Sequence, residues 1–403
     1  MHPRRAVINS LTMKTYDADI VIVGGGLVGA ALALALKNSS LSVILLEGRE
    51  PTLTFDLTSW DQRVYAISRA SRSLLTQIGA WPLLRSERLS PISAMKIYGD
   101  APHAKLEFDA LESGVDELAF IVENRELQRA LWLALDQASN VEIISPVELA
   151  SLHIDAAAAT VTLANQQTLS ARLVIGADGA NSWVRRQQGI EILSKPYQQF
   201  GVVANFACER PHYGAARQWF SPDGILAWLP LPNQQMSMVW SCNESQKDEL
   251  LGLSPELLAA RVAQAGSNAL GELKLITPPA AFPLKLSKIE QIAAARMAFV
   301  GDAAHTVHPL AGQGVNLGFG DVAELAALLI STHPERIGDL LVLRRYQRAR
   351  RESVLLMQSV CDGLQQLFNN QHPVLKSLRN IGLGFTDSLP WLKRQLIRHA
   401  MDS

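Results

Sequence analysis

Short apolar runs that alternate with helical patterns mark both ends of the chain. Residues 19–23 are a β-branched run, typical of a strand buried on both faces in a parallel sheet, and residues 41–46 form a second run of this kind. The Ala- and Leu-rich segment 30–37 between them predicts a helix. Later, the apolar run 297–300 is followed by apolar residues at helical spacing over 317–330. This alternation predicts a Rossmann-like α/β domain.

The middle of the chain is richer in strands. Strand-like runs are expected at 94–108, 141–149, 153–154, 160–163, 171–175, 200–204, 225–229 and 236–240. Helical patterns are expected at 72–80, 124–140 and 254–265. From residue 197 onward the strands dominate, and the chain returns to the first pattern near Phe282. The pattern therefore predicts a sheet-rich module inserted into the α/β domain.

The first apolar run leads into a glycine-rich loop. Gly24, Gly26 and Gly29 fit the spacing G-x-G-x-x-G, and Glu47 ends the second run. In such a unit the first glycine permits a tight turn, the second lets the backbone approach a pyrophosphate, and the third lets the helix pack closely on the strand. An acid at the end of the second strand holds ribose hydroxyls. Because all these parts occur in the right order, the segment predicts a dinucleotide site.

A second loop of this kind follows the run 297–300. Residues 301–316 are rich in Gly, Ala and Pro and stand between that run and the predicted helix. A strand–loop–helix unit directs backbone N–H groups and a positive helix end at an electron-rich ligand. Asp302, at the end of the run, offers a carboxylate to ligand hydroxyls. We therefore expect the two loops to form two halves of one site.

Composition narrows the class of protein. The 403 residues carry 37 Lys and Arg against 38 Asp and Glu, a balance that argues against a nucleic acid partner. Cys208, Cys242 and Cys361 are far apart and show no metal-ligand spacing, so we expect free thiols in a reducing cytoplasm and no metal site. Glycines and polar residues break the most apolar stretch, 20–46, which argues against a membrane span. The N-terminus lacks the apolar core of a secretory signal, and Met13 is an alternative start.

Three short motifs occur together in the chain: the glycine loop with Glu47, the pair Asp178-Gly179 and the pair Gly301-Asp302. This combination resembles the class A flavoprotein aromatic hydroxylases, single-component FAD monooxygenases that include p-hydroxybenzoate hydroxylase. Further segments are similar to the ubiquinone-biosynthesis hydroxylases within that class, namely 61–70, 122–125, 311–318, 379–383 and 392–396. The resemblance covers about residues 17–400, nearly the whole chain.

The resemblance implies an α/β fold of the p-hydroxybenzoate hydroxylase type. Its parts are a Rossmann-like FAD-binding domain, an inserted sheet-rich substrate domain and a C-terminal helical region. The expected division is a disordered extension at 1–16, a discontinuous FAD-binding domain at 17–75, 119–190 and 281–340, a substrate domain at 76–118 and 191–280, and the helical region at 341–403.

The resemblance also implies roles for individual residues. The glycine loop is expected to hold the FAD pyrophosphate, Glu47 the adenosine ribose, and Asp302 a ribityl hydroxyl. Arg63 and Arg125 are expected to face FAD from its flanks. The full set of expected FAD-binding residues is Gly24, Gly26, Gly29, Glu47, Arg63, Arg125, Asp178, Gly179, Asp302, Gly312, Gln313, Gly314, Val315 and Asn316. Within this set, Asp178 and Gly179 are also expected to contact the transient NAD(P)H, and residues 312–316 to lie along the pyrimidine edge of the flavin.

The implied reaction is the hydroxylation of an electron-rich phenol. NAD(P)H reduces FAD, and one oxygen atom of O2 passes to the ring, while the protein supplies position, electrostatics and exclusion of water. Backbone N–H groups of residues 312–314 are expected to stabilise negative charge on the reduced flavin. Pro309 is expected beside its reacting face. His305, His308 and Tyr213 are all candidates for a proton acceptor, and the sequence does not select among them.

The resemblance implies a polyprenylated phenol as substrate and other ubiquinone-biosynthesis proteins as partners. Residues 340–403 interleave cations with apolar residues, which is typical either of peripheral contact with an anionic inner membrane or of a helical appendage with solvated cations. The sheet-module residues Phe206, Trp219, Leu226 and Trp228 are expected either to line a channel for the apolar tail or to form plain core. A hydroxylase of a soluble aromatic compound and a non-catalytic accessory subunit stay open as alternative functions.

Overall fold

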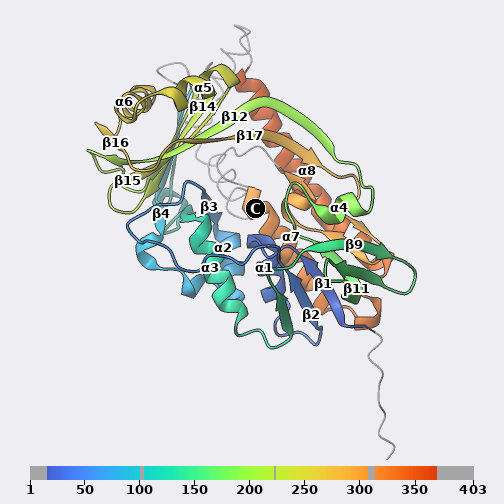
Figure 1. Ribbon diagram of the computed structural model, residues 1–403. Helices are drawn as coiled ribbons and strands as arrows, with labels where there is room; N and C mark the ends of the chain where they lie inside the picture. Colours follow the sequence, from blue (N-terminus) through green and yellow to red (C-terminus); the bar gives the residue numbers. More distant parts are fainter. Residues whose placement is uncertain (1–15, 100–103, 222–223, 307–313, 370–403) are drawn as a thin grey trace, which may run out of the picture.

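Two large sheets and one small sheet organise the molecule (Figure 1). The computed structural model describes residues 16–99, 104–221, 224–306 and 314–369. The first large sheet has eight strands: β1 (Ala18–Val23), β2 (Val43–Leu46), β8 (Val141–Ile144), β9 (Leu149–Ile154), β10 (Ala159–Leu163), β11 (Thr168–Gly176), β18 (Ala293–Ala294) and β19 (Met297–Phe299).

The parallel part of this sheet has a doubly wound order. It runs β8–β2–β1–β11–β19, and neighbouring strands in this series are parallel. The chain first moves outward from β1 through β2 and β8, and later moves the other way through β11 and β19. The direction of winding therefore reverses between β1 and β11, where ligands bind beyond the carboxyl ends of such strands. This order confirms the predicted Rossmann-like α/β fold.

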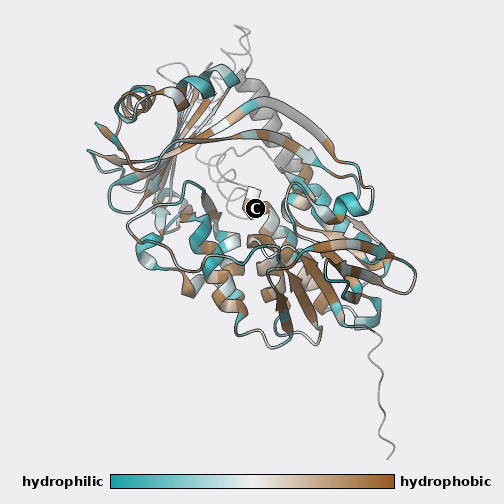
Figure 2. Cartoon of the chain, viewed as in Figure 1, coloured by the Kyte–Doolittle hydropathy of each residue, from teal (hydrophilic) through white to brown (hydrophobic). Residues whose placement is uncertain are grey.

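Helices cover the first sheet and explain why its strands are apolar on both faces. Figure 2 shows hydrophobic residues along β1, β2 and β11, and every side chain of β2 is buried. The covering helices are α1 (Leu27–Ala35), α3 (Asn124–Leu135), α7 (Gly314–Ile330) and α8 (Leu340–Asn369). The helix α1 packs against α3 and α7, and α7 packs against α8. The carboxyl ends of β2, β11 and β19, at residues 46, 176 and 299, therefore lie at one edge of a sheet that packed helices support.

The second large sheet has nine strands and is mostly antiparallel. Its members are β5 (Ala94–Tyr98), β6 (Lys105–Asp109), β12 (Leu193–Cys208), β13 (Ala215–Ser221), β14 (Gly224–Leu231), β15 (Gln235–Cys242), β16 (Leu273–Leu275), β17 (Ala280–Lys288) and β20 (His305–Thr306). The helices α5 (Glu244–Gly252) and α6 (Pro255–Ala265) pack at this sheet. Figure 1 shows β12 and β17 side by side across the top of the molecule, which agrees with their long antiparallel register.

A small sheet lies between the two large ones. It contains β3 (Val64–Ser68), β4 (Ser90–Ile92) and β7 (Ala119–Glu123), next to α2 (Arg69–Gln77). The pairing of β4 with β7 joins a strand of the expected substrate domain to one of the expected FAD-binding domain. Likewise, β17 pairs with β12 of the second sheet, although the sequence interpretation gave residues 281–340 wholly to the FAD-binding domain. Local patterns do not reveal such tertiary pairings, and the domain boundaries stay a prediction.

Most predicted elements occur at the predicted places, but several observed elements were not predicted, among them β3, β7, β13, β17 and α5. The helix α5 has no clear apolar stripe and buries only Gln246 and Leu250, so periodicity gave no signal for it. The expected extension and most of the C-terminal region, including residues 1–15 and 370–403, lie outside the described residues. Within the described chain, no helix combines the length and apolar character that membrane crossing requires.

Candidate active site

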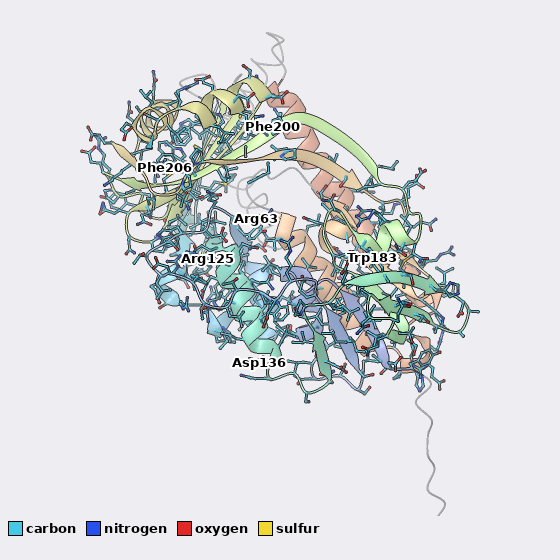
Figure 3. All side chains as sticks on the ribbon, viewed as in Figure 1. Arg63, Arg125, Asp136, Trp183, Phe200 and Phe206 are labelled. Atoms are coloured by element: carbon cyan, nitrogen blue, oxygen red, sulfur yellow. The ribbon has the colours of Figure 1, made fainter. Side chains whose placement is uncertain are left out.

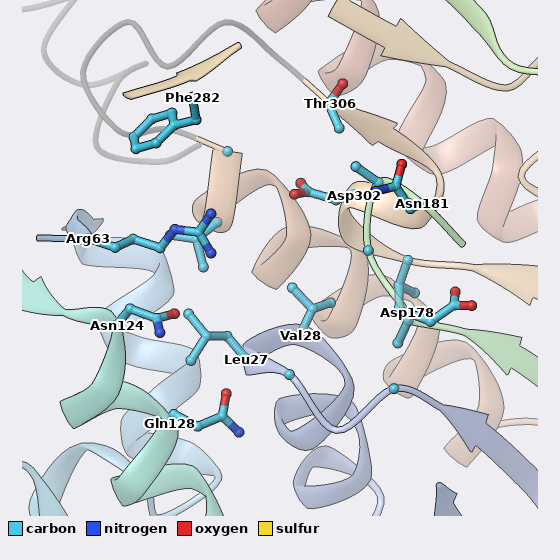
Figure 4. Close-up of a pocket in the computed structure, with 18 of the residues that line it drawn as sticks. Leu27, Val28, Arg63, Asn124, Gln128, Asp178, Asn181, Phe282, Asp302 and Thr306 are labelled. Carbon is cyan, nitrogen blue, oxygen red and sulfur yellow. The ribbon is translucent and has the colours of Figure 1, made fainter. Parts of the chain in front are cut away.

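The carboxyl ends of the parallel strands open into one large cavity (Figure 4). Its volume is about 1990 Å³, roughly twice the upper end, about 1000 Å³, of the range for pockets that hold one small molecule. One side comes from the segments that follow β1, β2, β11 and β19, and another from the nine-stranded sheet. The cavity therefore has room for a large cofactor and a second ligand.

The glycine loop after β1 forms part of this cavity. Gly24 has a φ of 104°, a conformation that suits glycine. A Cβ atom added at Gly29 would lie 1.9 Å from the carbonyl oxygen of Gly24, so only glycine lets α1 begin this close to the strand. At Gly26, in contrast, no atom lies within 4 Å of an added Cβ. Gly26 and the first residues of α1 line the cavity, so the positive end of the helix meets it there.

Three side chains outside the glycine motif hold Gly25 in the middle of the loop. The Gly25 N–H donates to Glu47 Oε2 at 2.6 Å, and its carbonyl accepts from Gln128 Nε2 and Trp132 Nε1, each at 2.8 Å. An added Cβ at Gly25 would lie 2.8 Å from the Trp132 ring. The peptide planes of the loop are therefore fixed from α3. A third consecutive glycine was the sequence signal for this contact, whereas nothing local pointed to Gln128 or Trp132.

Asp178 and Gly179, after β11, line the cavity beside the glycine loop. Asp178 Oδ2 accepts from the N–H groups of Trp183 at 2.6 Å and Val184 at 3.1 Å, at the start of α4 (Trp183–Gln187). Asp178 Oδ1 is buried and has no hydrogen-bond partner in the described part of the chain. Gly179 has a φ of 77°, and no atom lies within 4 Å of an added Cβ. The pair therefore presents an open backbone at Gly179 to the cavity, while the Asp178 carboxylate holds the start of α4.

Asp302 and Arg63 lie on opposite sides of the cavity in Figure 4. Asp302 follows β19 and is exposed to the cavity. The surrounding walls desolvate this carboxylate and raise the pKa of Asp302 above its ordinary value of 3.8, while the charges of His305 and Arg63 oppose the shift. Arg63 lies two residues after Asp61, and the Asp61 carboxylate accepts the N–H of Arg63 at 3.0 Å. The negative charge of Asp302 is thus only partly balanced by the neighbouring cations.

Arg125 does not line the cavity, contrary to the expectation that it faces FAD. Its Nε donates to Glu123 Oε1 at 3.0 Å and its Nη1 to Ser59 Oγ at 2.9 Å. Glu123 is fully buried, so it requires cationic partners, which Arg125 and Arg88 supply. Figure 3 shows Arg63 near the opening between the two large sheets and Arg125 farther from it. Sequence spacing did not reveal this buried ion cluster.

Three further candidates also lie off the cavity lining. Asn316 donates through Nδ2 to the carbonyl of Ala66 at 2.8 Å and thereby ties α7 to β3. His305 is buried behind the Asp302 turn, with Nε2 2.8 Å from Asp321 Oδ2. Tyr213 is 81% exposed in a surface turn. These positions argue against a direct proton-acceptor role for His305 and Tyr213.

The remaining expected residues divide into two groups. Gly314 and Val315, at the start of α7, line the cavity, as do Gly24, Gly26, Glu47, Arg63, Asp178, Gly179 and Asp302. Four expected residues lie outside the described residues, namely His308, Pro309, Gly312 and Gln313.

Apolar side chains of the nine-stranded sheet form the opposite side of the cavity. Val203, Val239 and Ala227 are paired across β12, β15 and β14, so they share one face of the sheet. The complete apolar lining from this sheet is Val203, Ala227, Leu229, Val239, Phe282, Pro283 and Leu284. We call this set the sheet wall.

The four large apolar residues expected at a channel lie on the face of the sheet that is turned away from the cavity. Phe206, Leu226 and Trp228 are buried in a core with Leu250 and Leu258 from α5 and α6. Trp219 packs against that core. Because strand side chains alternate, Ala227 and Leu229 of β14 face the cavity and belong to the sheet wall instead. The alternative left open by the sequence, that these residues are plain core, is therefore confirmed.

The residues at the cavity fit a dinucleotide. The open backbone at Gly26 and Gly179 lets phosphates approach closely, and the start of α1 favours an anion. The exposed Asp302 carboxylate is an acceptor for ligand hydroxyls. All of these groups surround the point between β1 and β11 where a doubly wound sheet binds nucleotides.

Comparisons with known proteins agree with this geometry. The sequence model of the FAD binding domain family matches residues 17–358. The chain is 37% identical to the 3-demethoxyubiquinol 3-hydroxylase of Escherichia coli (strain K12), over 96% of this chain and 100% of that protein. It is 35% identical to the ubiquinone hydroxylase UbiL of Rhodospirillum rubrum, over 95% of this chain and 89% of that protein. The crystal structure of p-nitrophenol 4-monooxygenase PnpA from Pseudomonas putida DLL-E4 has the same fold, with a TM-score of 0.77, 19% identity and coverage of 96% and 98%.

The fold, the cavity and these matches define an FAD-dependent monooxygenase of class A. Within that class, the chain belongs to the family of ubiquinone-biosynthesis hydroxylases. This confirms the resemblance carried by the glycine loop, by Gly301-Asp302 and by the segments 61–70 and 311–318. It also confirms FAD as the cofactor.

Proposed function

We propose that the protein hydroxylates the aromatic ring of a polyprenylated phenol in ubiquinone biosynthesis, with NAD(P)H and O2 as co-substrates. The observation that carries the proposal is the shared cavity, which has dinucleotide-type loops on one side and the apolar sheet wall on the other. The relatives at 37% and 35% identity are named for hydroxylation of ubiquinol or ubiquinone compounds, which supports the pathway. When bound, FAD supplies the oxygen-transfer chemistry.

In this proposal the first side of the cavity binds FAD. The glycine loop and the first turn of α1 hold the pyrophosphate, because Gly26 leaves its backbone open. Glu47, which already accepts the Gly25 N–H, accepts from the adenosine ribose as well. Asp302 accepts from a ribityl hydroxyl, and such a bond to a charged acceptor is strong. Arg125 and Asn316 then have no contact with FAD: Arg125 binds Glu123 and Ser59, and Asn316 binds the carbonyl of Ala66.

The sheet wall binds the substrate in this proposal. Val203, Val239 and Ala227 present small apolar side chains in one row, which leaves space for a planar ring and the first part of a prenyl tail. The apolar wall excludes water from the reacting face of the flavin. Roles for Pro309 and His308 stay predictions, since both lie outside the described residues.

A substrate with a long prenyl tail resides in a bilayer, so we also infer peripheral contact with the membrane. The basic and apolar composition of residues 340–403 supports this inference. Deletion of residues 389–403 is expected to reduce co-sedimentation with anionic liposomes. Unchanged co-sedimentation would reject this part of the proposal.

Quinone profiling in a deletion strain tests the proposed function. The chain is expressed in bacteria that lack one ring hydroxylase of the pathway, and lipid extracts are analysed by mass spectrometry. We expect it to restore quinone and remove one accumulated intermediate in one such strain. The Asp302→Ala variant at equal expression is the matched control and should restore less. If no strain is restored while the purified protein oxidises a soluble aromatic acid with NAD(P)H, the substrate assignment is wrong.

A further inference from the structure

Three charged or titratable side chains form a buried cluster directly behind the Asp302 turn. Asp321 of α7 is fully buried, and its Oδ2 accepts the N–H of Gly301 at 2.9 Å. His305 Nε2 lies 2.8 Å from the same oxygen, and Arg350 Nε of α8 donates to Oδ1 at 2.7 Å. None of these three side chains lines the cavity. The cluster therefore touches the backbone of the site turn but not the space in which a ligand binds.

The charge of Asp321 is maintained in spite of its burial. Burial raises the pKa of Asp321, but His305 and Arg350 outweigh this effect and hold the pKa below its ordinary value. Arg350 is fixed in turn, because its Nη2 donates to the carbonyl of Leu317 at 3.0 Å. An ion pair in a core adds little net stability compared with apolar packing. A role in setting geometry is therefore a better account of the cluster than a role in stability alone.

The turn that the cluster holds has little conformational freedom. Gly301 has a φ of 59°, and an added Cβ would lie 3.1 Å from the Val28 side chain of α1. An added Cβ at Gly318 of α7 would lie 2.7 Å from the same side chain. A second contact from α8 supports the strand before the turn, since Tyr346 Oη donates to the carbonyl of Phe299 at 2.9 Å. Contacts from α7 and α8 thus hold the turn in place beside α1.

We propose that Asp321, with His305 and Arg350, is a positioning cluster that fixes the Gly301 peptide and so aims the Asp302 carboxylate at the ribityl part of FAD. This inference rests on the proposed role of Asp302. It replaces the expectation that His305 is a proton acceptor with a structural task for that side chain. It also gives α8 a function at the site, through Arg350.

The test compares FAD with ADP, because ADP contains the half of FAD that does not reach Asp302. Binding of each to the apoprotein is measured by isothermal titration calorimetry for the wild type and for Asp321→Asn. We expect the FAD dissociation constant to rise at least about tenfold and the ADP constant to change by less than about twofold. The bound flavin is also expected to show a shifted absorption spectrum, which general loss of stability would not produce.

A matched control is available in β1 of the first large sheet. Asp19 accepts the N–H of Ser42 at 2.9 Å and pairs with Arg172 at 3.0 Å, so it resembles Asp321 in its partners but lies away from the cavity. Asp19→Asn should change neither constant. Should Asp321→Asn fail to fold, Arg350→Gln and His305→Gln are taken through the same two titrations, with the same expectation.

Two results would overturn the proposal: equal weakening of FAD and ADP, or FAD affinity that does not change. Failure of the underlying assignment would look different. In that case Asp302→Ala itself would bind FAD as tightly as the wild type does, whatever the cluster variants show.

Discussion

At the scale of single residues, the described part of the site contains polar groups that lack a full set of hydrogen-bond or charge partners. Asp178 Oδ1 has no hydrogen-bond partner within the described residues, and the pKa of Asp302 is raised by desolvation. Groups of this kind cost stability in the ligand-free protein and are common where a ligand will bind. We therefore expect substitutions at Asp302 to affect ligand binding and stability in opposite directions.

Asp302→Ala is expected to weaken FAD binding. The ribityl hydroxyl loses a charged acceptor, which costs on the order of 1.5–3 kcal/mol, or about ten- to a hundredfold in affinity. Fluorescence titration of the apoprotein with FAD measures this change. Asp109→Ala, at the end of β6 and away from the cavity, is the control. An affinity within about twofold of wild type would refute the role of Asp302.

Asp302→Asn is expected to stabilise the apoprotein near neutral pH. The folded-state pKa of Asp302 lies above its unfolded value, so the ionised group disfavours folding above the folded pKa. This unfavourable contribution disappears as the pH falls through the raised pKa. The melting temperature of the variant should therefore exceed that of wild type at about pH 7, and the difference should shrink on acidification. A lower melting temperature at neutral pH would contradict the direction of the shift.

Among the residues of the cavity, the sequence identified the ones that belong to a motif and directly follow a strand. Gly24, Gly26, Glu47 and Asp302 line the cavity as expected, because strand ends in a doubly wound sheet converge. The contacts of Trp132 and Gln128 with Gly25 could not be predicted, since 107 and 103 residues separate the partners. The position of Arg125 could not be predicted either, because the burial of Glu123 decides it.

At the scale of elements, the second and third glycines of the G-x-G-x-x-G motif, Gly26 and Gly29, have separable tasks. Gly26→Val is expected to fold, because Gly26 has an ordinary φ of −65° and no atom lies within 4 Å of an added Cβ. That side chain would occupy the place of the pyrophosphate, so the purified protein should be colourless. Gly29→Ala should fail to fold, because its Cβ would lie 1.9 Å from a backbone oxygen. Absorbance at the flavin band and circular dichroism measure the two outcomes.

Normal flavin content in Gly26→Val would show that the pyrophosphate lies elsewhere. A well-folded Gly29→Ala protein would show that α1 does not need its close approach to β1.

For the nine-stranded sheet, the sequence predicts that side chains alternate between two faces, but it does not predict which face borders the cavity. Alternation along β14 separates Leu226 and Trp228 from Ala227 and Leu229, and the sequence contains that pattern. Which of the two faces packs against α5 and α6 depends on the path that the chain takes after the last of these strands. The helix α5 itself was not predicted. Phe206, Trp228 and Trp240 fill the helix-covered core, whereas Val203, Ala227 and Val239 of the same three strands border the cavity.

Ala227→Phe is expected to narrow the cavity at the sheet wall. The kcat/KM for a polyprenylated phenol should fall by at least about tenfold, while FAD content stays normal. Ala157→Phe in an exposed turn is the matched control. Steady-state assays with long- and short-tailed phenols measure the effect, which should be larger for the long tail. An equal loss with both substrates would place the tail away from this wall.

At the scale of the whole molecule, the site depends on the contact between sheets. Asn205 of β12 donates through Nδ2 to the carbonyl of Asp61 at 2.9 Å. The Asp61 carboxylate in turn accepts the N–H groups of Arg63 and Arg125, at 3.0 and 3.1 Å. The sheet wall and the proposed FAD-binding side are therefore linked through one short segment. The cavity therefore depends on segments from both sheets and on the contacts that join them.

The central claim is that this cavity brings FAD and a polyprenylated phenol together for ring hydroxylation. The most direct test supplies the purified, FAD-loaded protein with NAD(P)H, isotopically labelled O2 and a polyprenylated phenol, and analyses the product by mass spectrometry. The account predicts one labelled oxygen atom on the aromatic ring, with no product from Gly26→Val. Consumption of NAD(P)H without label in the ring, or label only in a soluble aromatic acid offered in parallel, would contradict it.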